Sequence, residues 1–334
     1  MGLRIAVLYN DDAALLHGDA GDALAVAAVV PCARAVTQAL QARGHRAEMI
    51  GLKPDLPTLA RTLAGLDVEL VFNLVEALGG DARLEAAMAW LYELARLRYT
   101  GSPPEAMTLG LDKPLCKAVL RDRGIAVAPG VLVVNGNEPF GDLRYPAIVK
   151  PAHEDASHGI TVDSVVANEA MARTRARDVV ARYRQPALVE SFLPGREFNV
   201  AVLGAGADAH CLELAEIAFD ELPASHPPLV TYEAKWAEDS EAFLKTPSIA
   251  ARALAPALAA AIRRTALDAY RAVGLRDYGR VDLRLDHDGQ PCVLEVNPNP
   301  DISPDAGLAR AAERSGIPYD ELIDRIVRDT AQRA

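Results

Sequence analysis

The chain has 334 residues, half of them hydrophobic and about a quarter charged. This length is large for one hydrophobic core, so two or three domains are expected, and the composition is ordinary for a soluble globular protein. The formal net charge is −11 and no basic block occurs, which disfavours binding to a nucleic-acid backbone. An acidic substrate would therefore need a local basic site.

The cysteines and the apolar runs indicate a cytoplasmic protein. Cys32, Cys116, Cys211 and Cys292 are widely spaced and form no Cys-x-x-Cys pair, which favours buried thiols in a reducing compartment. The N-terminus turns polar too early for a signal peptide. No apolar run approaches the roughly 18 residues that a membrane span needs, so no membrane association is expected.

The first hundred residues alternate between strand and helix patterns. Apolar runs predict strands at residues 3–9, 47–50 and 68–73, and helical spacing predicts helices at residues 23–43, 56–63 and 84–97. This alternation is typical of a doubly wound parallel sheet. Its ligands would lie beyond the carboxyl ends of the strands, near Asn10, Asn73 and residues 99–101.

A second unit is predicted after a break at residues 101–104. It holds a helix at 111–123, strands at 131–134, 147–150 and 187–190, a polar loop at 151–159 and a helix at 171–183. A turn at residues 193–195 marks the next boundary.

The rest of the chain predicts paired strands, a long functional loop, a hairpin and three helices. The strands are at 197–203 and 210–218, the loop is at 220–246, and the helices are at 249–273, 305–314 and 319–333. Pro256 would kink or restart the first of these helices. The predicted fold class is α/β, with α+β character after the first sheet, and the predicted domains are 1–101, 102–190 and 191–334.

The segment 279–297 predicts a β-hairpin. Asp288-Gly289 is a strong signal for a two-residue turn, because such a turn needs positive φ at both positions. This turn sets the register of the two strands. Leu285 then faces Cys292, Asp282 faces Glu295, and Arg280 faces Asn297.

Side chains alternate along a strand, so the hairpin has a polar and an apolar face. The polar face carries Arg280, Asp282, Glu295 and Asn297, and the apolar face carries Val281, Leu283, Leu285, Leu294 and Val296. Two carboxylates facing each other at about 5 Å repel, and Mg²⁺, which prefers oxygen ligands, would offset this repulsion. The alternative is an exposed hairpin with a salt bridge from Arg280 to one acid.

Nucleotide-binding signals are individually weak. No P-loop sequence occurs, and Gly204-Ala205-Gly206 lacks the third glycine of a dinucleotide-binding loop. Lys150 ends an apolar strand before a loop of small residues, whose N–H groups can cradle a phosphate; the alternative is a lysine before a solvated turn. Lys113, at a helix start, and Lys235, in the long loop, are uninformative alone.

The segment 190–198 joins two predicted domains. A linker of this kind offers backbone donors and acceptors to a planar base, and the carboxylate of Glu197 suits ribose hydroxyls. The alternative is a plain turn between domains.

Seven short motifs follow one another with compatible spacing. They are Asp112-Lys113, Ile148-Val149-Lys150-Pro151, residues 188–193, Arg196-Glu197-Phe198, residues 232–235, Gly279-Arg280-Val281-Asp282 and Leu294-Glu295-Val296-Asn297. In this order they resemble the ATP-grasp superfamily, most closely its D-alanine–D-alanine ligase-like branch. The resemblance covers residues 71 to 326 approximately and implies an ATP-grasp fold.

The resemblance also implies a role for each motif residue. Lys113 and Lys150 contact the ATP phosphates, and Ser157 and its loop close over them. Glu190, Ser191, Phe192 and Leu193 line the adenine pocket, Leu294 packs under the base, and Glu197 takes the ribose. Lys235 reaches the phosphates and Arg280 stabilises the transferring phosphoryl group. Asp282, Glu295 and Asn297 hold two Mg²⁺ ions, with Mn²⁺ as an alternative.

The implied chemistry is ligation. A carboxylate attacks the γ-phosphate of ATP to give an acyl phosphate, and an amine then displaces phosphate to form an amide. The substrates would be amino acids, peptides or related small carboxylates and amines, and the relatives suggest a homodimer. Two other hypotheses are an ATP-binding regulatory protein without ligase activity and an ATP-grasp kinase.

The chain departs from the family where the family binds its substrates. Ala156 stands for a serine, Trp236 for a tyrosine, Asp301 for a glycine and Ala306 for a serine, and residues 10–14 hold no counterpart of an N-terminal glutamate. A carboxylate at Asp301 would repel a substrate carboxylate and suit an amine. We therefore predict substrates other than two D-alanines, with Asp301 and Trp236 at the substrate site. Asp11, Asp12, His17, Asp19 and Asp22 would add to an amine site or form a solvated loop.

Overall fold

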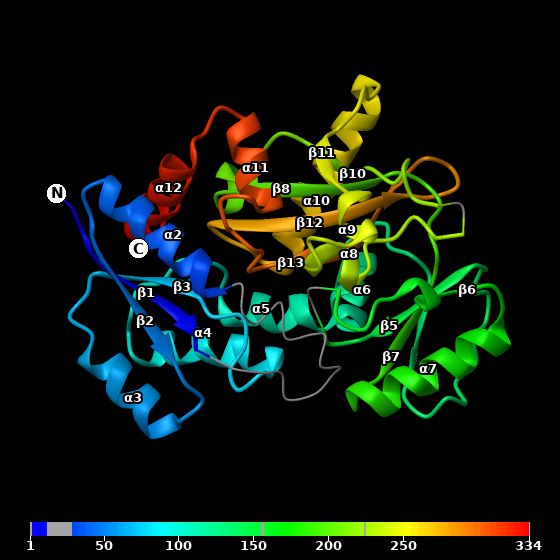
Figure 1. The fold of residues 1–334 in the computed structure, drawn as a ribbon, viewed down its shortest axis with the longest axis horizontal. Helices are drawn as coiled ribbons and strands as arrows, with labels where there is room; N and C mark the ends of the chain where they lie inside the picture. Colours follow the sequence, from blue (N-terminus) through cyan, green and yellow to red (C-terminus); the bar gives the residue numbers. More distant parts are fainter. Residues whose placement is uncertain (1, 12–28, 155–156, 224, 334) are drawn as a thin grey trace.

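The computed structural model describes residues 2–11, 29–154, 157–223 and 225–333. Its strands form three sheets, and the chain takes them in order from one side of the molecule to the other and back (Figure 1). The last helix returns to the first sheet, so both termini lie on that side.

The first sheet is parallel, as predicted. It has the order β2-β1-β3, with β1 (Arg4–Asn10), β2 (Arg46–Leu52) and β3 (Leu70–Leu74). Its helices are α2 (Val29–Ala42), α3 (Leu56–Gly65) and α4 (Glu85–Leu94), with a short 3-10 turn, η2 (Ala82–Leu84). The first helix was expected from residue 23, and residues 23–28 lie outside the described residues.

The second sheet is antiparallel, with the order β4-β7-β5-β6. Its elements are β4 (Gly130–Val133), β5 (Ala147–Pro151), η3 (Val162–Ser164), β6 (Val165–Val166), α7 (Glu169–Tyr183) and β7 (Ala187–Ser191). Two helices precede it, α5 (Pro104–Leu111), which the sequence patterns did not predict, and α6 (Lys113–Asp122). The predicted domain limit after residue 190 falls inside β7.

The third sheet is also antiparallel, with the order β11-β10-β8-β12-β13 and β9 beside β8. Its strands are β8 (Glu197–Leu203), β9 (His210–Cys211), β10 (Ala215–Ile217), β11 (Ser248–Ala250), β12 (Tyr278–Leu285) and β13 (Pro291–Asn297). The remaining elements are η4 (Gly206–Asp208), α8 (Tyr232–Trp236), α9 (Glu241–Leu244), α10 (Pro256–Val273), α11 (Gly307–Arg314) and α12 (Tyr319–Gln332).

Two predictions for this region were wrong in detail. The helix expected at 249–273 begins at Pro256, because proline suits the first turn, where its missing N–H is not needed. The residues before it form the edge strand β11 instead. The long loop at 220–246 is not structureless, since it contains α8 and α9.

The hairpin of β12 and β13 differs from the prediction at its turn. Asp286 N donates to Gln290 O at 2.9 Å and Gly289 N to Asp286 O at 3.1 Å. Gly289 has φ +72°. The loop therefore has three residues, 287–289, and Leu285 faces Pro291 rather than Cys292. This loop type, with glycine in the left-handed region, is the next most common after the two-residue turns.

A β-bulge at Leu294 restores the predicted register further along the hairpin. Asp282 faces Glu295 and Arg280 faces Asn297. Val293 and Val296 both point into the core, being 0% and 1% exposed. Leu294 and Glu295 between them line a cavity instead, so the placement of Leu294 on the apolar face was wrong.

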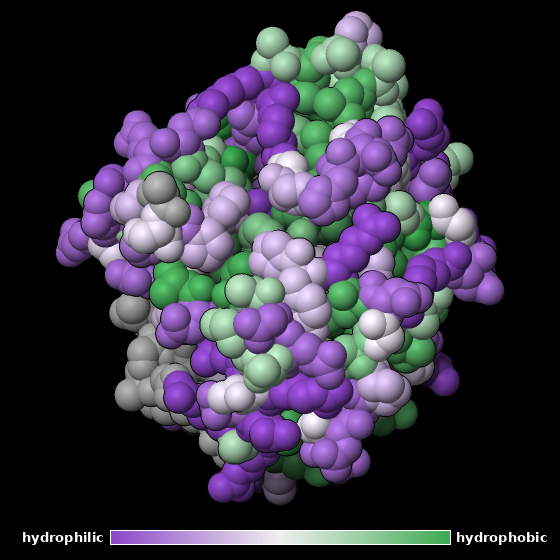
Figure 2. Space-filling view, turned by 90° about the vertical axis from the view of Figure 1, so that its right-hand side faces the viewer, coloured by the Kyte–Doolittle hydropathy of each residue, from purple (hydrophilic) through white to green (hydrophobic). Residues whose placement is uncertain are grey.

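The surface mixes polar and apolar residues. Figure 2 shows the end of the molecule with the second sheet, where hydrophilic residues predominate and hydrophobic ones lie between them. No helix among the described residues is long and apolar enough to cross a membrane.

Candidate active site

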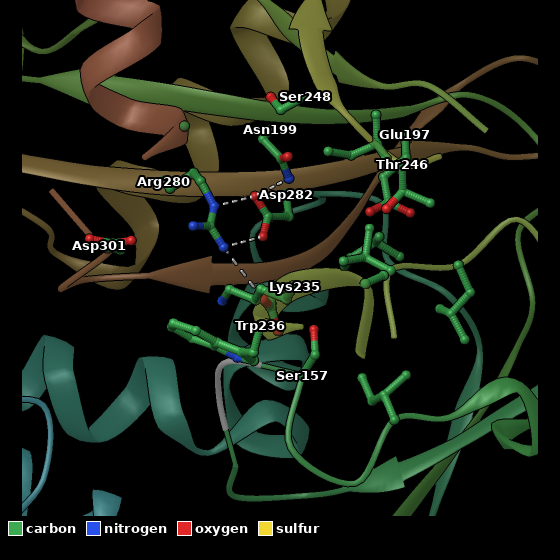
Figure 3. Close-up of a pocket in the computed structure, with 18 of the residues that line it drawn as sticks. Ser157, Glu197, Asn199, Lys235, Trp236, Thr246, Ser248, Arg280, Asp282 and Asp301 are labelled. Atoms are coloured by element: carbon green, nitrogen blue, oxygen red, sulfur yellow. Dashed lines mark hydrogen bonds and ion pairs between the residues drawn. The ribbon is translucent and has the colours of Figure 1, made fainter. Parts of the chain in front are cut away.

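A cavity of about 1280 Å³ lies where the second and third sheets face each other. Strands β5 and β7 supply one wall, strands β8, β12 and β13 supply the other, and α8 lies over the opening (Figure 3). The residues to which the family resemblance gives a role all line this cavity except Asn297, which lies beside it and bonds to two lining residues. The positions that the strand pattern placed near a ligand, Asn10, Asn73 and residues 99–101, do not line it.

The third sheet presents a row of charged side chains to the cavity. Alternate residues of β12 point the same way, so Arg280, Asp282 and Arg284 share this face. Glu197 and Asn199 join them from β8, in register with Arg284 and Asp282. Strand β13 adds Glu295 and Asn297. Seven charged or amide side chains from three neighbouring strands thus meet at one surface.

Asp282 is at the centre of this row and accepts four hydrogen bonds. Arg280 donates from Nε to Oδ1 and from Nη2 to Oδ2, both at 2.8 Å. Asn199 Nδ2 donates to Oδ1 at 2.8 Å and Asn297 Nδ2 to Oδ2 at 3.1 Å. A carboxylate offers about four lone-pair directions, so these donors occupy all of them, and a metal ion bound to Asp282 would take the place of one donor.

Glu295 stands directly opposite Asp282 and stays ionised. Burial would raise its pKa, but Lys113, Lys150 and Arg280 outweigh burial and lower the pKa to about 2. Lys113 Nζ lies 3.8 Å from its Oε2 and Arg280 Nη2 lies 3.9 Å from its Oε1. Two facing carboxylates are therefore held together by cations and by the amide of Asn297.

A hard divalent cation fits the trio formed by Asp282, Glu295 and Asn297. Two carboxylates and one amide supply the oxygen donors that Mg²⁺ prefers. Among the residues that the structure describes, no group of three or more His, Cys, Asp and Glu side chains converges, so the trio depends on its amide. Phosphate oxygens complete such sites in enzymes that use nucleotides.

Lys150 and Glu190 form a second charged cluster on the wall opposite. Lys150 Nζ lies 2.8 Å from Glu190 Oε2, and Lys117 pairs with Oε1. Gly130 faces Glu190 across the sheet, and a Cβ there would come within 2.8 Å of its Cγ. Burial lowers the pKa of Lys117 to about 8, whereas Glu190 holds the pKa of Lys150 above its ordinary value.

Lys117 was missed by the sequence reasoning. It follows Lys113 by four residues on α6, and residues four apart share a helix face. Lys113 itself donates to Glu154 O at the edge of the cavity. The spacing of the two lysines was therefore a signal that both point toward the second sheet.

Glu197 is paired with Arg284, a second residue that was missed. Arg284 Nη1 lies 3.0 Å from Glu197 Oε2, and its guanidinium stacks on Phe192 at 4.6 Å. Burial raises the pKa of Glu197 to about 7, with Asp282 and Glu295 adding to the rise and Arg284 opposing it. Alternation along β12 places Arg284 on the same face as Arg280, so this signal was present in the sequence.

The helix α8 and the loop after β5 meet above the cavity. Tyr232 stacks on His158 with ring centroids 5.3 Å apart, and Tyr232 N donates to Ile160 O at 3.0 Å. Lys235 and Trp236 follow on the same helix, and their side chains lie near Ser157 (Figure 3). The two segments thus form a cover over the charged row.

Asp301 lies at the other end of the row from Glu197, with Arg280 between them (Figure 3). Its Oδ1 accepts a hydrogen bond from Ser303 N at 2.8 Å, and Ala306 lines the cavity nearby. Ala156 and the acidic positions Asp12, Asp19 and Asp22, with His17, lie outside the described residues. Asp11 is exposed, with its carboxylate 3.8 Å from Lys53 Nζ.

Comparisons with known proteins match this chain to one family. A family model described as "D-ala D-ala ligase C-terminus" matches residues 132–328. The protein y4sG of Sinorhizobium fredii, named uncharacterized, is 37% identical over 306 residues, which are 90% of this chain and 87% of that protein. A D-alanine–D-alanine ligase of Bordetella petrii is 33% identical over 302 residues, 89% and 86% of the two chains.

Solved structures give the same fold. The D-alanine–D-alanine ligase of Bacillus anthracis, complexed with ATP, has a TM-score of 0.75 at 18% identity and covers 98% of this chain and 97% of its own. That of Coxiella burnetii has a TM-score of 0.74 at 20% identity, with 99% and 94% covered. The α/β fold of ATP-grasp type expected from the sequence is therefore confirmed.

Proposed function

Because the chain belongs to the D-alanine–D-alanine ligase family of ATP-dependent C–N ligases, we propose that it joins a small carboxylate to an amine and that its substrates are not two D-alanines. The observation that carries this proposal is the convergence of Lys150, Arg280, Asp282 and Glu295 on one cavity. Cations and oxygen donors in that arrangement suit a triphosphate and its metal.

Within this proposal, ATP occupies the end of the cavity near β7. Lys113, Lys150 and Lys235 contact its phosphates, with Ser157 above them, and Glu197 takes the ribose. Adenine lies among side chains of β7, the following linker and the bulge of β13: Glu190, Ser191, Phe192, Leu193 and Leu294. Lys150 pairs with Glu190 through one contact, so its other N–H donors can turn to a phosphate, and Lys117 also helps to neutralise Glu190.

Asp282, Glu295 and Asn297 would hold the two Mg²⁺ ions, or Mn²⁺ in their place. The ions, when bound, supply charge neutralisation on the phosphates. Arg280 contributes the same kind of stabilisation from the protein, because it lies between the metal trio and Asp301.

The proposed reaction has two steps. A carboxylate oxygen of the first substrate attacks the γ-phosphorus of ATP, the bond to the β-phosphate oxygen breaks, and ADP leaves. The amine of the second substrate then attacks the acyl carbon, inorganic phosphate leaves and the amine loses a proton. The cover formed by α8 and the loop at 157–160 excludes water, which would otherwise hydrolyse the acyl phosphate.

The substrate end differs from the family at Asp301, Ala306 and Trp236. Asp301 would place a negative charge near Arg280, at the opposite end of the row from Glu197 and the proposed ribose. This charge favours an amine or another cationic group and disfavours a substrate carboxylate. The names of the ligases above describe action on D-alanine by those proteins, and our proposal for this chain is a different pair of amino acids, peptides or related metabolites.

A phosphate-release assay over a panel of amino acids and dipeptides, with ATP and Mg²⁺, tests the proposal. We expect little release with D-alanine alone and robust release with another acid and amine pair, whose product has lost one water. Robust synthesis of D-alanyl-D-alanine would contradict the substrate proposal. A product heavier by a phosphate would indicate a kinase, and nucleotide binding without release for any pair would indicate a regulatory protein.

The organisation of the chain is also proposed here. We propose domains near residues 1–101, 102–190 and 191–334, with the second limit moved to the linker after β7, which ends at Ser191. A homodimer in the cytoplasm is the proposed state, and sedimentation of the purified chain tests the dimer.

A further inference from the structure

We infer that Asn199 is a positioning residue that fixes the carboxylate of Asp282 in the orientation that binds the metal. This inference rests on the proposed function, which assigns Asp282 to magnesium. Asn199 itself is not one of the metal ligands proposed above.

The register of the third sheet places Asn199 beside Asp282. Asn199 on β8 and Asp282 on β12 are direct partners, and Glu295 is the partner of Asp282 on the other side. Asn199 Nδ2 lies 2.8 Å from Asp282 Oδ1, and Asp282 is only 5% exposed. Both residues line the cavity, and Figure 3 shows the amide of Asn199 directed at the carboxylate.

The other two donors to Asp282 have further proposed roles. Arg280 is assigned to the transferring phosphoryl group, which gives its guanidinium another partner if a bound metal takes its place on Asp282. Asn297 is assigned to the metal, and its amide would present oxygen to that ion. Asn199 is the donor to Asp282 that has no other proposed partner, so we expect it to stay on Asp282 throughout the reaction.

A carboxylate needs such a donor to keep a defined orientation. The terminal torsion of aspartate is broad and roughly two-fold, so packing alone does not fix it. A hydrogen bond from a neighbouring strand does fix it, because both ends are attached to a rigid sheet. Removal of outer partners of metal ligands typically weakens metal binding by roughly 10 to 100 times.

Binding of Mn²⁺ to the full-length chain, measured by calorimetry with a non-hydrolysable ATP analogue present, tests the inference. Asn199→Leu keeps the side-chain volume and removes the donor, and we expect its Mn²⁺ affinity to fall at least about tenfold. Asn199→Ala is the smaller alternative if the leucine variant fails to fold. Asn199→Gln retains an amide donor and should recover part of the affinity.

Ser248→Ala is the matched control. Ser248 lines the same cavity, two strands away on β11, and its buried hydroxyl has no hydrogen-bond partner among the residues that the structure describes. Its loss should leave Mn²⁺ affinity unchanged. In turnover, the Asn199 variants should raise the metal concentration needed for half-maximal rate while kcat at saturating metal is largely kept.

The outcomes separate a failure of the role of Asn199 from a failure of the proposed function. Wild-type affinity in Asn199→Leu or Asn199→Ala, or an equal loss in Ser248→Ala, would overturn the role of Asn199 and leave the proposed function intact. No Mn²⁺ binding by the wild-type chain with the nucleotide analogue would overturn both.

Discussion

Lys150 Nζ lies 2.8 Å from Glu190 Oε2, and both side chains are almost completely buried. Lys117 pairs with the other oxygen of the same carboxylate. Burial would raise the pKa of Glu190, but the two lysines outweigh it and lower the pKa. The cluster therefore carries one net positive charge beside the cavity, and this charge is available to a phosphate.

Removing Lys117 should destabilise the chain strongly. In Lys117→Met, Glu190 keeps only Lys150, and breaking a buried ion pair in this way costs about 3 kcal/mol or more. Urea denaturation measures the free energy of unfolding. Lys245→Met is the control, because Lys245 pairs with Glu241 on an exposed helix face and its loss should cost under about 0.5 kcal/mol. Equal effects of the two substitutions would show that the buried cluster is unimportant for stability.

The bulge in β13 predicts different effects for two leucines of one hairpin. Leu283 is fully buried, so Leu283→Ala should cost about 2–5 kcal/mol of unfolding free energy. Leu294 faces the cavity, so Leu294→Ala should cost about 1 kcal/mol and weaken binding of an ATP analogue roughly tenfold. Thermal unfolding and calorimetry measure the two effects. A larger stability loss at Leu294 than at Leu283 would contradict the bulge.

The same hairpin shows how far the sequence could be interpreted. The prediction paired Asp282 with Glu295 correctly, although it assumed a turn that is one residue too short. The three-residue loop shifts the register by one position and the bulge at Leu294 shifts it back. Local patterns could not show either shift, because a bulge depends on which side chains the core and the cavity accept.

The residues that were missed belong to long-range pairs. Lys117 and Glu190 are 73 positions apart, and Arg284 and Glu197 are 87 apart. Each member could be placed on a helix face or strand face from local spacing. Which carboxylate it meets depends on how the sheets pack, and local spacing carries no information about that.

The pair of Glu197 and Arg284 predicts a pH dependence of stability. The pKa of Glu197 is raised from its ordinary value of 4.5 to about 7, first by burial. Between these values the folded chain holds a proton on Glu197 that the unfolded chain has lost, so this contribution to stability falls as the pH rises. The full change is about 3 kcal/mol.

Comparison with Glu197→Gln isolates that contribution, since the amide does not titrate. The unfolding free energy of the wild-type chain, relative to Glu197→Gln, should decrease from pH 4.5 to pH 7. Urea denaturation at several pH values measures the difference. A difference that stays constant or increases with pH would show that Arg284 keeps Glu197 ionised throughout.

Substitutions of Asp301 should change the substrate preference in two ways: one should weaken binding of the amine substrate, and the other should improve activity with D-alanine. Asp301→Asn keeps the acceptor for Ser303 N and removes the negative charge. The KM for the amine substrate should rise roughly tenfold while the KM for ATP is unchanged, because Asp301 lies at the opposite end of the charged row from Glu197, which is proposed to bind the ribose. Asp301→Gly introduces the glycine that the family resemblance places at this position, and it should increase phosphate release with D-alanine.

Asp288→Asn, at the exposed tip of the hairpin, is the control and should change neither KM. An unchanged KM for the amine in Asp301→Asn would mean that this carboxylate does not receive the substrate, and the specificity would then have to depend on other residues of the cavity.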